Sequence, residues 1–302
     1  MTVLINEDFE GDLSAWYDDT SYTLTTGDFH TGAKSLLWDW TIGQTSPQNR
    51  VSMRKLFAAS DQLYVSFYVK HETGWQGSAQ DTHPHLTYIL SDKDGTFQPL
   101  ANGTLVFYIE DIVGTSGAIV PHIVAQDSQM VDVANIGVDL SGVTENRSVM
   151  SANGVQNTGG QTVDGVFGGP DHFFFDPFWY SSYSWNAPTV RFNENQWDHV
   201  EVFVKLNSII GGIGQVDGKI RMWVNAQLAI TNDAVILRTG AHSPRLRFNQ
   251  YVLAPFMGVA SPITQSMWLD DLLVQDVNPR DAVGSFSAMR SLGNKLPRLR
   301  SD

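Results

Sequence analysis

Residues 196–225, QWDHVEVFVKLNSIIGGIGQVDGKIRMWVN, decide the fold class because apolar and polar side chains alternate along two of their segments. Apolar residues occupy every second position from Val200 to Leu206, and again from Ile220 to Val224. A period of two places such residues on one face of a β-strand. The glycine-rich stretch between the segments ends in Asp-Gly, which favours a turn. The stretch therefore predicts a β-hairpin with one aliphatic face turned to a core.

The opposite face of this hairpin would carry an unusual set of side chains: Glu201, Lys205, Arg221 and Trp223. Such a face is either an ordinary solvated sheet surface or a place where a ligand is bound. The tryptophan among the charges favours a ligand-binding face.

Short alternating runs separated by Gly, Asn, Asp and Pro continue on both sides of the hairpin, and no window shows sustained helical spacing. Many short strands of this kind predict an antiparallel sandwich or barrel. We expect one all-β domain over residues 1–277. Residues 278–302 contain few large apolar side chains and are predicted to form an extended tail that leaves the domain. The segment 114–170 is expected to form long loops, with one or two short strands near AIVPHIVAQ and RSVMSAN.

The charge distribution limits the class of partner. The chain has 302 residues and a net charge of −13, but residues 278–302 carry +3, which leaves −16 for the rest. An acidic body repels a phosphate backbone and an anionic bilayer, so neither nucleic acid nor a membrane is expected as the main partner. The basic tail is too short and sparse to overturn this expectation.

The absence of cysteine excludes disulfides and a cysteine nucleophile. No run approaches the ~18 apolar residues of a membrane-spanning helix. The opening MTVLINEDFEG has neither a basic nor an apolar signal region, so we expect no Sec signal in this chain. An extracellular or virion-surface location would then follow from lysis or assembly.

Three stretches together resemble the concanavalin A-like lectin/glucanase superfamily, whose laminin-G-like members are jelly rolls. They are FEG with the later TGAKSL, the 196–225 hairpin, and the closing WLDDLLV at 268–274. They span about residues 3–277. The resemblance implies two antiparallel sheets packed face to face, one of them concave. Its members include lectins, carbohydrate-binding modules, glycanases, polysaccharide lyases and virion domains, so the fold alone does not decide the function.

A structural calcium site is implied by the same resemblance. In relatives, an acid of the first strand, a carbonyl of the following turn and an aspartate of the last strand bind one ion. This set maps onto Asp8 or Glu10, Gly32 and Asp270. Carboxylate and carbonyl oxygens are the ligands that Ca²⁺ prefers, although a solvated acidic edge would look the same in the sequence.

A sugar-binding groove is the second expectation. If the strands pair as in relatives, one concave face would carry the hairpin residues together with others. These others are Arg247, Asn249, Tyr251, Tyr108 and Glu110, with His83 and His85 at the rim. Aromatic rings stack on pyranose rings, and basic groups suit uronate carboxylates. The expected contact residues are Trp223, Arg221, Tyr251, Glu201, Tyr108 and Asn249.

Catalysis is possible in the same groove. A glycanase needs two carboxylates flanking the bond, but the E-x-D-x-x-E strand motif is missing and Glu201 stands alone. A polysaccharide lyase needs a base and a group that holds the uronate carboxylate. Tyr108 or His85 would be the base, and Arg221 or Lys205 would hold the carboxylate.

Two further features have alternative interpretations. His83 and His85 flank a proline and have metal-ligand spacing, but no third ligand is evident. Residues 171–185 contain eight aromatics, which suit a core or an intersubunit contact better than a sugar platform.

The sequence favours non-catalytic recognition of a polysaccharide or surface glycan. A lyase acting on uronate polymers is the alternative, and a structural virion or fibre domain that binds only protein is a third. The last would involve a homo-oligomer or a virion neighbour docked through the C-terminal tail.

Overall fold

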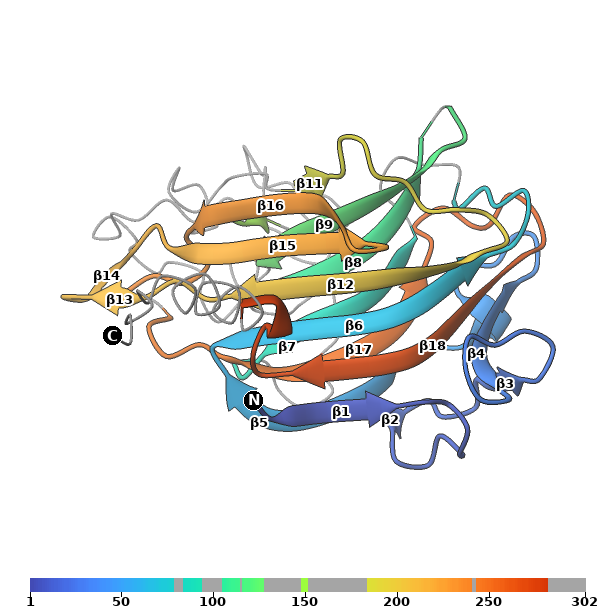
Figure 1. Cartoon of the computed structure of the whole chain (residues 1–302), viewed down its shortest axis with the longest axis horizontal. Helices are drawn as coiled ribbons and strands as arrows, with labels where there is room; N and C mark the ends of the chain where they lie inside the picture. Colours follow the sequence, from blue (N-terminus) through green and yellow to red (C-terminus); the bar gives the residue numbers. More distant parts are fainter. Residues whose placement is uncertain are drawn as a thin grey trace, which may run out of the picture.

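The computed structural model describes residues 1–78, 84–93, 105–114, 116–127, 148–151, 184–240 and 243–281. Two eight-stranded sheets make up the fold. Sheet A has the order β16 (Gln227–Val235), β15 (Gly218–Val224), β12 (Trp197–Lys205), β6 (Gln62–His71), β18 (Gln265–Gln275), β4 (Ser35–Trp40) and β3 (Thr23–Thr25), and β1 (Val3–Glu7) pairs with β18. Figure 1 shows sheet A lying across sheet B as a second layer.

Sheet B has the order β10 (Met150–Ser151), β9 (Ile119–Asp127), β8 (Val106–Val113), β7 (His85–Ser91), β17 (Phe248–Phe256), β5 (Met53–Ser60) and β2 (Tyr17–Asp18), and β11 (Ser184–Asn186) pairs with β9. Among the strands that the structure describes, every strand pair is antiparallel except that of β10 with β9. The described residues also form a small hairpin of β13 (Ile209–Ile210) and β14 (Ile213–Gly214) and a 3₁₀ turn at Pro47–Asn49. Among the described residues, no helix is long and apolar enough to cross a membrane.

The hairpin predicted from residues 196–225 is present as β12 and β15, with Val202 paired to Met222 and Val200 to Val224. Val202 is 0% exposed and Val224 is 1% exposed, so the aliphatic face lies in the core between the sheets. The two-layer antiparallel sandwich and the predicted register are therefore confirmed. Residues on the opposite face of β12 and β15 point away from the core.

A bulge changes the phase of β17. The register shifts between Phe248 and Gln250 against both neighbouring strands. An extra residue in a strand reverses the alternation beyond it, so Tyr251 turns inward and is fully buried in the core. The prediction that Arg247, Asn249 and Tyr251 share one outward face was wrong for this reason.

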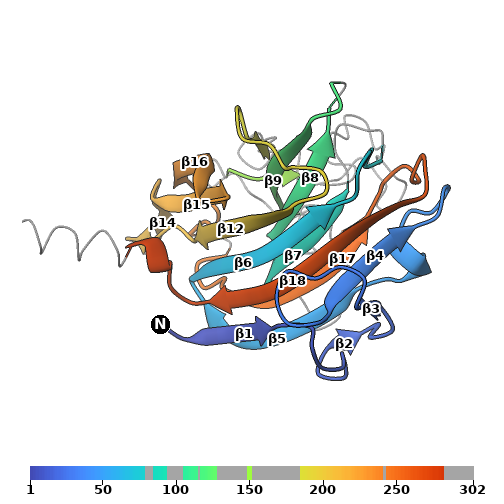
Figure 2. The same ribbon diagram turned by 45° about the vertical axis from the view of Figure 1, so that its right-hand side comes forward.

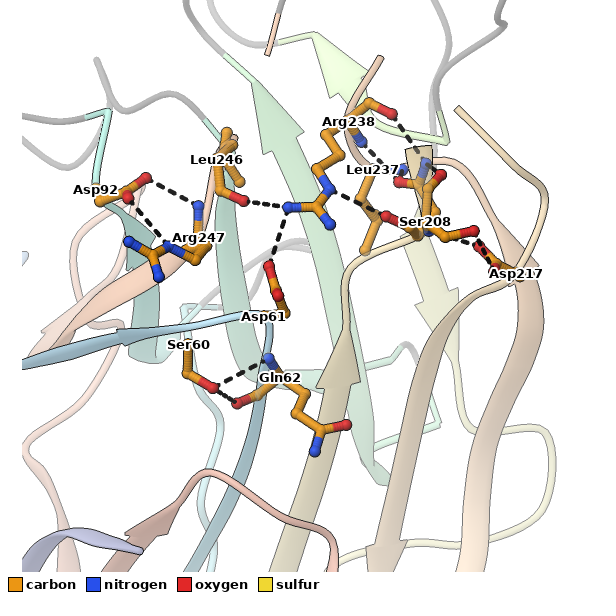
Figure 3. Close-up of polar contacts among 11 residues, drawn as sticks. Ser60, Asp61, Gln62, Asp92, Ser208, Asp217, Leu237, Arg238, Leu246 and Arg247 are labelled. Carbon is orange, nitrogen blue, oxygen red and sulfur yellow. Dashed lines mark hydrogen bonds and ion pairs between the residues drawn. The ribbon is translucent and has the colours of Figure 1, made fainter. Parts of the chain in front are cut away.

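The connection from β16 to β17 is fixed by Arg238 (Figure 3). Its guanidinium donates to the carbonyls of Leu246 (2.7 Å) and Asn207 (3.0 Å), and it pairs with Asp61 at 3.0 Å. The Asn207 side chain accepts hydrogen bonds from the backbone amides of Leu237 and Arg238. This network holds the crossing from sheet A to sheet B.

Candidate functional site

The candidate site residues are divided between the two sheets. Glu201, Lys205, Arg221 and Trp223 belong to sheet A, whereas His85, Tyr108, Glu110 and Asn249 belong to sheet B. The prediction of one shared concave face was therefore wrong. Alternation indicates which residues share a face of one strand, but only strand order decides which strands share a sheet.

On the outer face of sheet A, three of the four hairpin residues already have partners. Trp223 is 8% exposed and packs with Tyr64 and Phe203. Arg221 pairs with Asp233, and Lys205 is exposed. Glu201 is paired with Arg280, which follows the last strand.

The outer face of sheet B carries a row of four side chains across four adjacent strands: Phe256 (β17), His85 (β7), Glu110 (β8) and His122 (β9). Strand register sets each of them opposite the next. We call this set the histidine row. Glu110 binds the Nδ1 atoms of both His85 and His122, one with each carboxylate oxygen.

Glu110 remains ionised inside the protein. Burial alone would raise its pKa, but the charges and hydrogen bonds of His85 and His122 outweigh burial and lower the pKa to about 2. A carboxylate held at Nδ1 fixes the orientation and tautomer of an imidazole. Of the three side chains, that of His85 reaches the surface most, at 19% exposure against 1% for Glu110.

A second row runs beside the first: Arg54 (β5), Val252 (β17), Tyr88 (β7), Tyr108 (β8) and Val124 (β9). We call this set the tyrosine row. The ring centroids of His85 and Tyr108 lie 4.5 Å apart, and those of Tyr88 and Tyr108 lie 4.9 Å apart. The two rows therefore meet at His85 and Tyr108.

The two tyrosines have different surroundings. The Gln126 amide donates a hydrogen bond of 2.8 Å to the Tyr108 hydroxyl oxygen. An N–H directed at this oxygen stabilises charge that develops there. Burial raises the pKa of Tyr88 well above its usual value, and negative charge at Tyr108 and Glu110 would raise it further. Tyr88 is consequently a proton-bearing phenol.

At the end of the tyrosine row, Arg54 is almost fully buried. It donates to the Gln250 side-chain oxygen at 2.6 Å and pairs with Asp18 at 3.1 Å. The Arg54 guanidinium is therefore already bound by side chains of the protein.

The residues of the expected calcium site lie around one turn. The Glu10 carboxylate accepts hydrogen bonds from the amides of Ala33 (2.7 Å) and Lys34 (2.8 Å), next to Gly32. Asp270 accepts from the amides of His30 and Thr31, and Asp8 accepts from the Glu10 amide. These oxygens face N–H donors, and within the described ranges no three acidic or histidine side chains are grouped to hold an ion. Calcium therefore stays a proposal.

Sequence reasoning missed His122, Gln126, Tyr88 and Arg280. His122, Val124 and Gln126 alternate on β9 just as Tyr108 and Glu110 do on β8, so the pattern was visible, but the pairing of the two strands was not. His83 and most of the aromatic run at 171–185 lie outside the described residues, as does the expected tail beyond residue 281.

No model of a known protein family matches the sequence, and no curated protein does. Solved structures do match. A marine PL-14 alginate lyase from Aplysia kurodai aligns over 91% of this chain and 99% of its own, at 12% identity and a TM-score of 0.50. The alginate lyase vAL-1 from a Chlorella virus aligns over 85% and 89%, at 12% identity and 0.50.

An endo-β-1,4-glucuronan lyase from the fungus Trichoderma reesei aligns over 91% of this chain and 96% of its own, at 9% identity and a TM-score of 0.50. Identities this low establish the fold and not the activity. The chain therefore has the two-sheet antiparallel jelly-roll fold that these solved structures share.

Proposed function

We propose that the protein is a polysaccharide lyase that acts on a uronate-containing glycan at the outer face of sheet B. The observation that carries the proposal is the ionised Glu110, which holds two imidazoles beside Tyr108. Binding alone does not require a buried carboxylate that sets the tautomers of two histidines. Acid–base chemistry gains from it, because a proton carrier must be held in a defined orientation and tautomer.

In β-elimination, a base removes the C5 proton of the uronate. The electron pair forms the C4–C5 double bond, the C4–O glycosidic bond breaks, and the leaving oxygen takes up a proton. No oxidant or further reactant is needed. Stabilisation of the carboxylate as charge develops, together with correctly placed proton donors, lowers the barrier.

The rows of sheet B supply these groups. Tyr108 or His85 is the base, as the sequence suggested. Tyr88 keeps its proton and suits the donor to the leaving oxygen. Arg221 and Lys205 lie on sheet A, so the uronate carboxylate would instead be held by Gln126 and the His122 imidazole.

The choice of substrate class follows the structural neighbours, which are named as lyases of alginate and of glucuronan. The protein would meet such polymers outside a cell or on a virion surface.

The test is incubation of the protein with alginate and with glucuronan while the ultraviolet absorbance of unsaturated uronate is recorded. We expect absorbance to grow, and Tyr108→Phe or Glu110→Gln to lower the rate by about 10²–10⁴-fold. Arg221→Ala on sheet A is the control and should leave the rate unchanged. Cleavage that persists in both sheet B variants would contradict the assignment of the site.

Recognition without cleavage is the second candidate. The burial of Tyr88 (2% exposed) and Tyr108 (4% exposed) favours it, since a base must reach its substrate. Retention of protein on immobilised alginate, with no gain in absorbance over days, would select this function. Loss of retention in His85→Ala would still place the ligand on sheet B.

A further inference from the structure

The chain that follows β18 returns to sheet A. Figures 1 and 2 show this segment, in dark red, turning back from the end of β18 toward β6 and β12. Asn278 is 1% exposed. Its side-chain oxygen accepts a hydrogen bond of 3.1 Å from the Arg280 amide, and its carbonyl accepts one of 3.2 Å from the Asp281 amide. These bonds form a tight turn that presents Arg280 to the sheet.

Arg280 is held by Glu201 in a two-point contact. Its Nε donates to one carboxylate oxygen at 2.9 Å, and its Nη2 donates to the other. The Tyr64 hydroxyl donates to Glu201 at 2.6 Å. A planar guanidinium matched to a carboxylate in this way is both stronger and more specific than a single contact.

An aromatic face completes the contact. The Arg280 guanidinium carbon lies 4.8 Å from the centroid of the Trp223 ring, within the range of a cation–π interaction. The next residue, Asp281, lies 3.7 Å from Arg221 on the same strand as Trp223. Arg280 and Asp281 thus face Glu201 and Arg221 of the sheet, so each contact joins opposite charges.

Without Arg280, the outer face of sheet A would contain a buried carboxylate with no cation beside it. Glu201 is 4% exposed, and an unpaired carboxylate at that depth is costly. Burial would raise the pKa of Glu201, but the hydrogen bond and charge of Arg280, aided by Tyr64, lower it. Three buried side chains from three strands therefore converge on one cation.

We propose that Tyr64, Glu201 and Trp223 form a guanidinium-binding site on the outer face of sheet A, and that Arg280 of the same chain occupies it as a latch. The site is separate from the proposed lyase site, because it lies on the other sheet. It holds residues 278–281 against sheet A, and it is specific for an arginine side chain.

The first test is limited trypsin digestion of the full chain, with cleavage at Arg280–Asp281 followed by mass spectrometry. Trypsin must take the arginine side chain into its own pocket, so a latched Arg280 is protected. Glu201→Gln should speed cleavage at this bond by about tenfold or more. Asp61→Asn, which removes the ion pair with Arg238 at the turn before β6, is the matched control. Equal cleavage rates in wild type and Glu201→Gln would overturn the proposal.

The second test does not depend on the stability of a Glu201 variant. Arg280→Ala in the full chain empties the site while removing only a partly exposed side chain. Guanidinium chloride at about 10 mM should then raise the Tm by about 2 °C relative to equal sodium chloride, through mass action. Wild type and Arg280→Ala/Glu201→Gln should not respond. No rise in the single variant, or an equal rise in the double variant, would rule out the guanidinium site.

Light scattering distinguishes the alternative occupant. A monomer with Arg280 protected supports the latch within one chain. If protection is present only in a dimer and is lost on dilution, Arg280 of a second copy fills the site and the proposed cis latch is wrong.

Discussion

Glu110 and Asp111 are consecutive residues of β8, and their carboxylates lie on opposite faces of sheet B, each paired with histidine. Glu110 faces outward to His85 and His122, whereas Asp111 faces inward to His71 of sheet A. Both acids are almost completely buried. Burial raises the pKa of Asp111 despite its histidine, while two histidines lower that of Glu110 to about 2.

The lowered pKa of Glu110 predicts acid sensitivity. Its ordinary value is 4.5, so its contribution to the free energy of unfolding is complete above pH 4.5 and is lost as the pH falls towards 2. The shift corresponds to the order of 3 kcal/mol. The free energies of unfolding of wild type and Glu110→Gln, measured in urea across this pH range, should converge at low pH. Asp61→Asn changes an exposed acid, so its free energy of unfolding should vary with pH in parallel with that of wild type. A Glu110→Gln curve that also runs parallel to wild type would refute the prediction.

The buried pair of His71 and Asp111 predicts non-additive mutational effects. Removing one partner leaves a buried polar group alone, so His71→Leu or Asp111→Leu should each destabilise by about 3–5 kcal/mol. The double variant should lose less than the sum, because no unpaired group remains. Denaturant unfolding of wild type, the two single variants and the double variant gives the complete double-mutant cycle. Strict additivity would mean that the pair does not interact energetically.

Arg238 and Arg247 form a matched comparison near the crossing between the sheets (Figure 3). The side chain of Arg238 is 12% exposed and that of Arg247 is 50% exposed, with Arg247 lying 3.8 Å from Asp92. Arg238→Ala should cost about 2–4 kcal/mol, since two carbonyls and Asp61 lose their donor. Arg247→Ala should cost less than about 1 kcal/mol. Equal losses in chemical unfolding would contradict the role assigned to Arg238.

The calcium proposal has its own measurement. If an ion replaces the amides around Glu10 and Asp270, calcium added to chelator-treated protein should raise the Tm in proportion to the logarithm of its concentration. Asp270→Asn should abolish this response, while Asp12→Asn, at a solvent-exposed acid, should retain it. The proposal would be wrong if calcium titration released no heat in a calorimeter and if chelator left the Tm unchanged.

Sequence alternation predicted the strands and their inward faces well. Val202, Met222 and Val224 lie in the core as expected, because burying aliphatic side chains fixes the register of a strand with one solvated face. Tyr251 was misplaced because the bulge between Phe248 and Gln250 leaves no clear mark in the sequence.

The composition of the candidate site was harder to predict. Tyr108 and His85 were identified together, and they do lie together. Arg221 and Trp223 could join them only if one sheet carried all four residues, and the two pairs belong to different sheets. The pairing of β7 with β17 and of β6 with β12 depends on contacts between distant segments, which local patterns do not encode. Arg280 was missed as the partner of Glu201 for the same reason.

The position of β18 in the interior of sheet A affects how the chain can fold as it is made. β6, β4 and β1 all pair with this late strand, so an emerging polypeptide lacks their common neighbour until about residue 275 has left the ribosome. Until then β4 and β6 present unpaired edges, which are sites of aggregation. Nascent chains that stall before β18 should therefore depend on chaperones far more than the completed protein does.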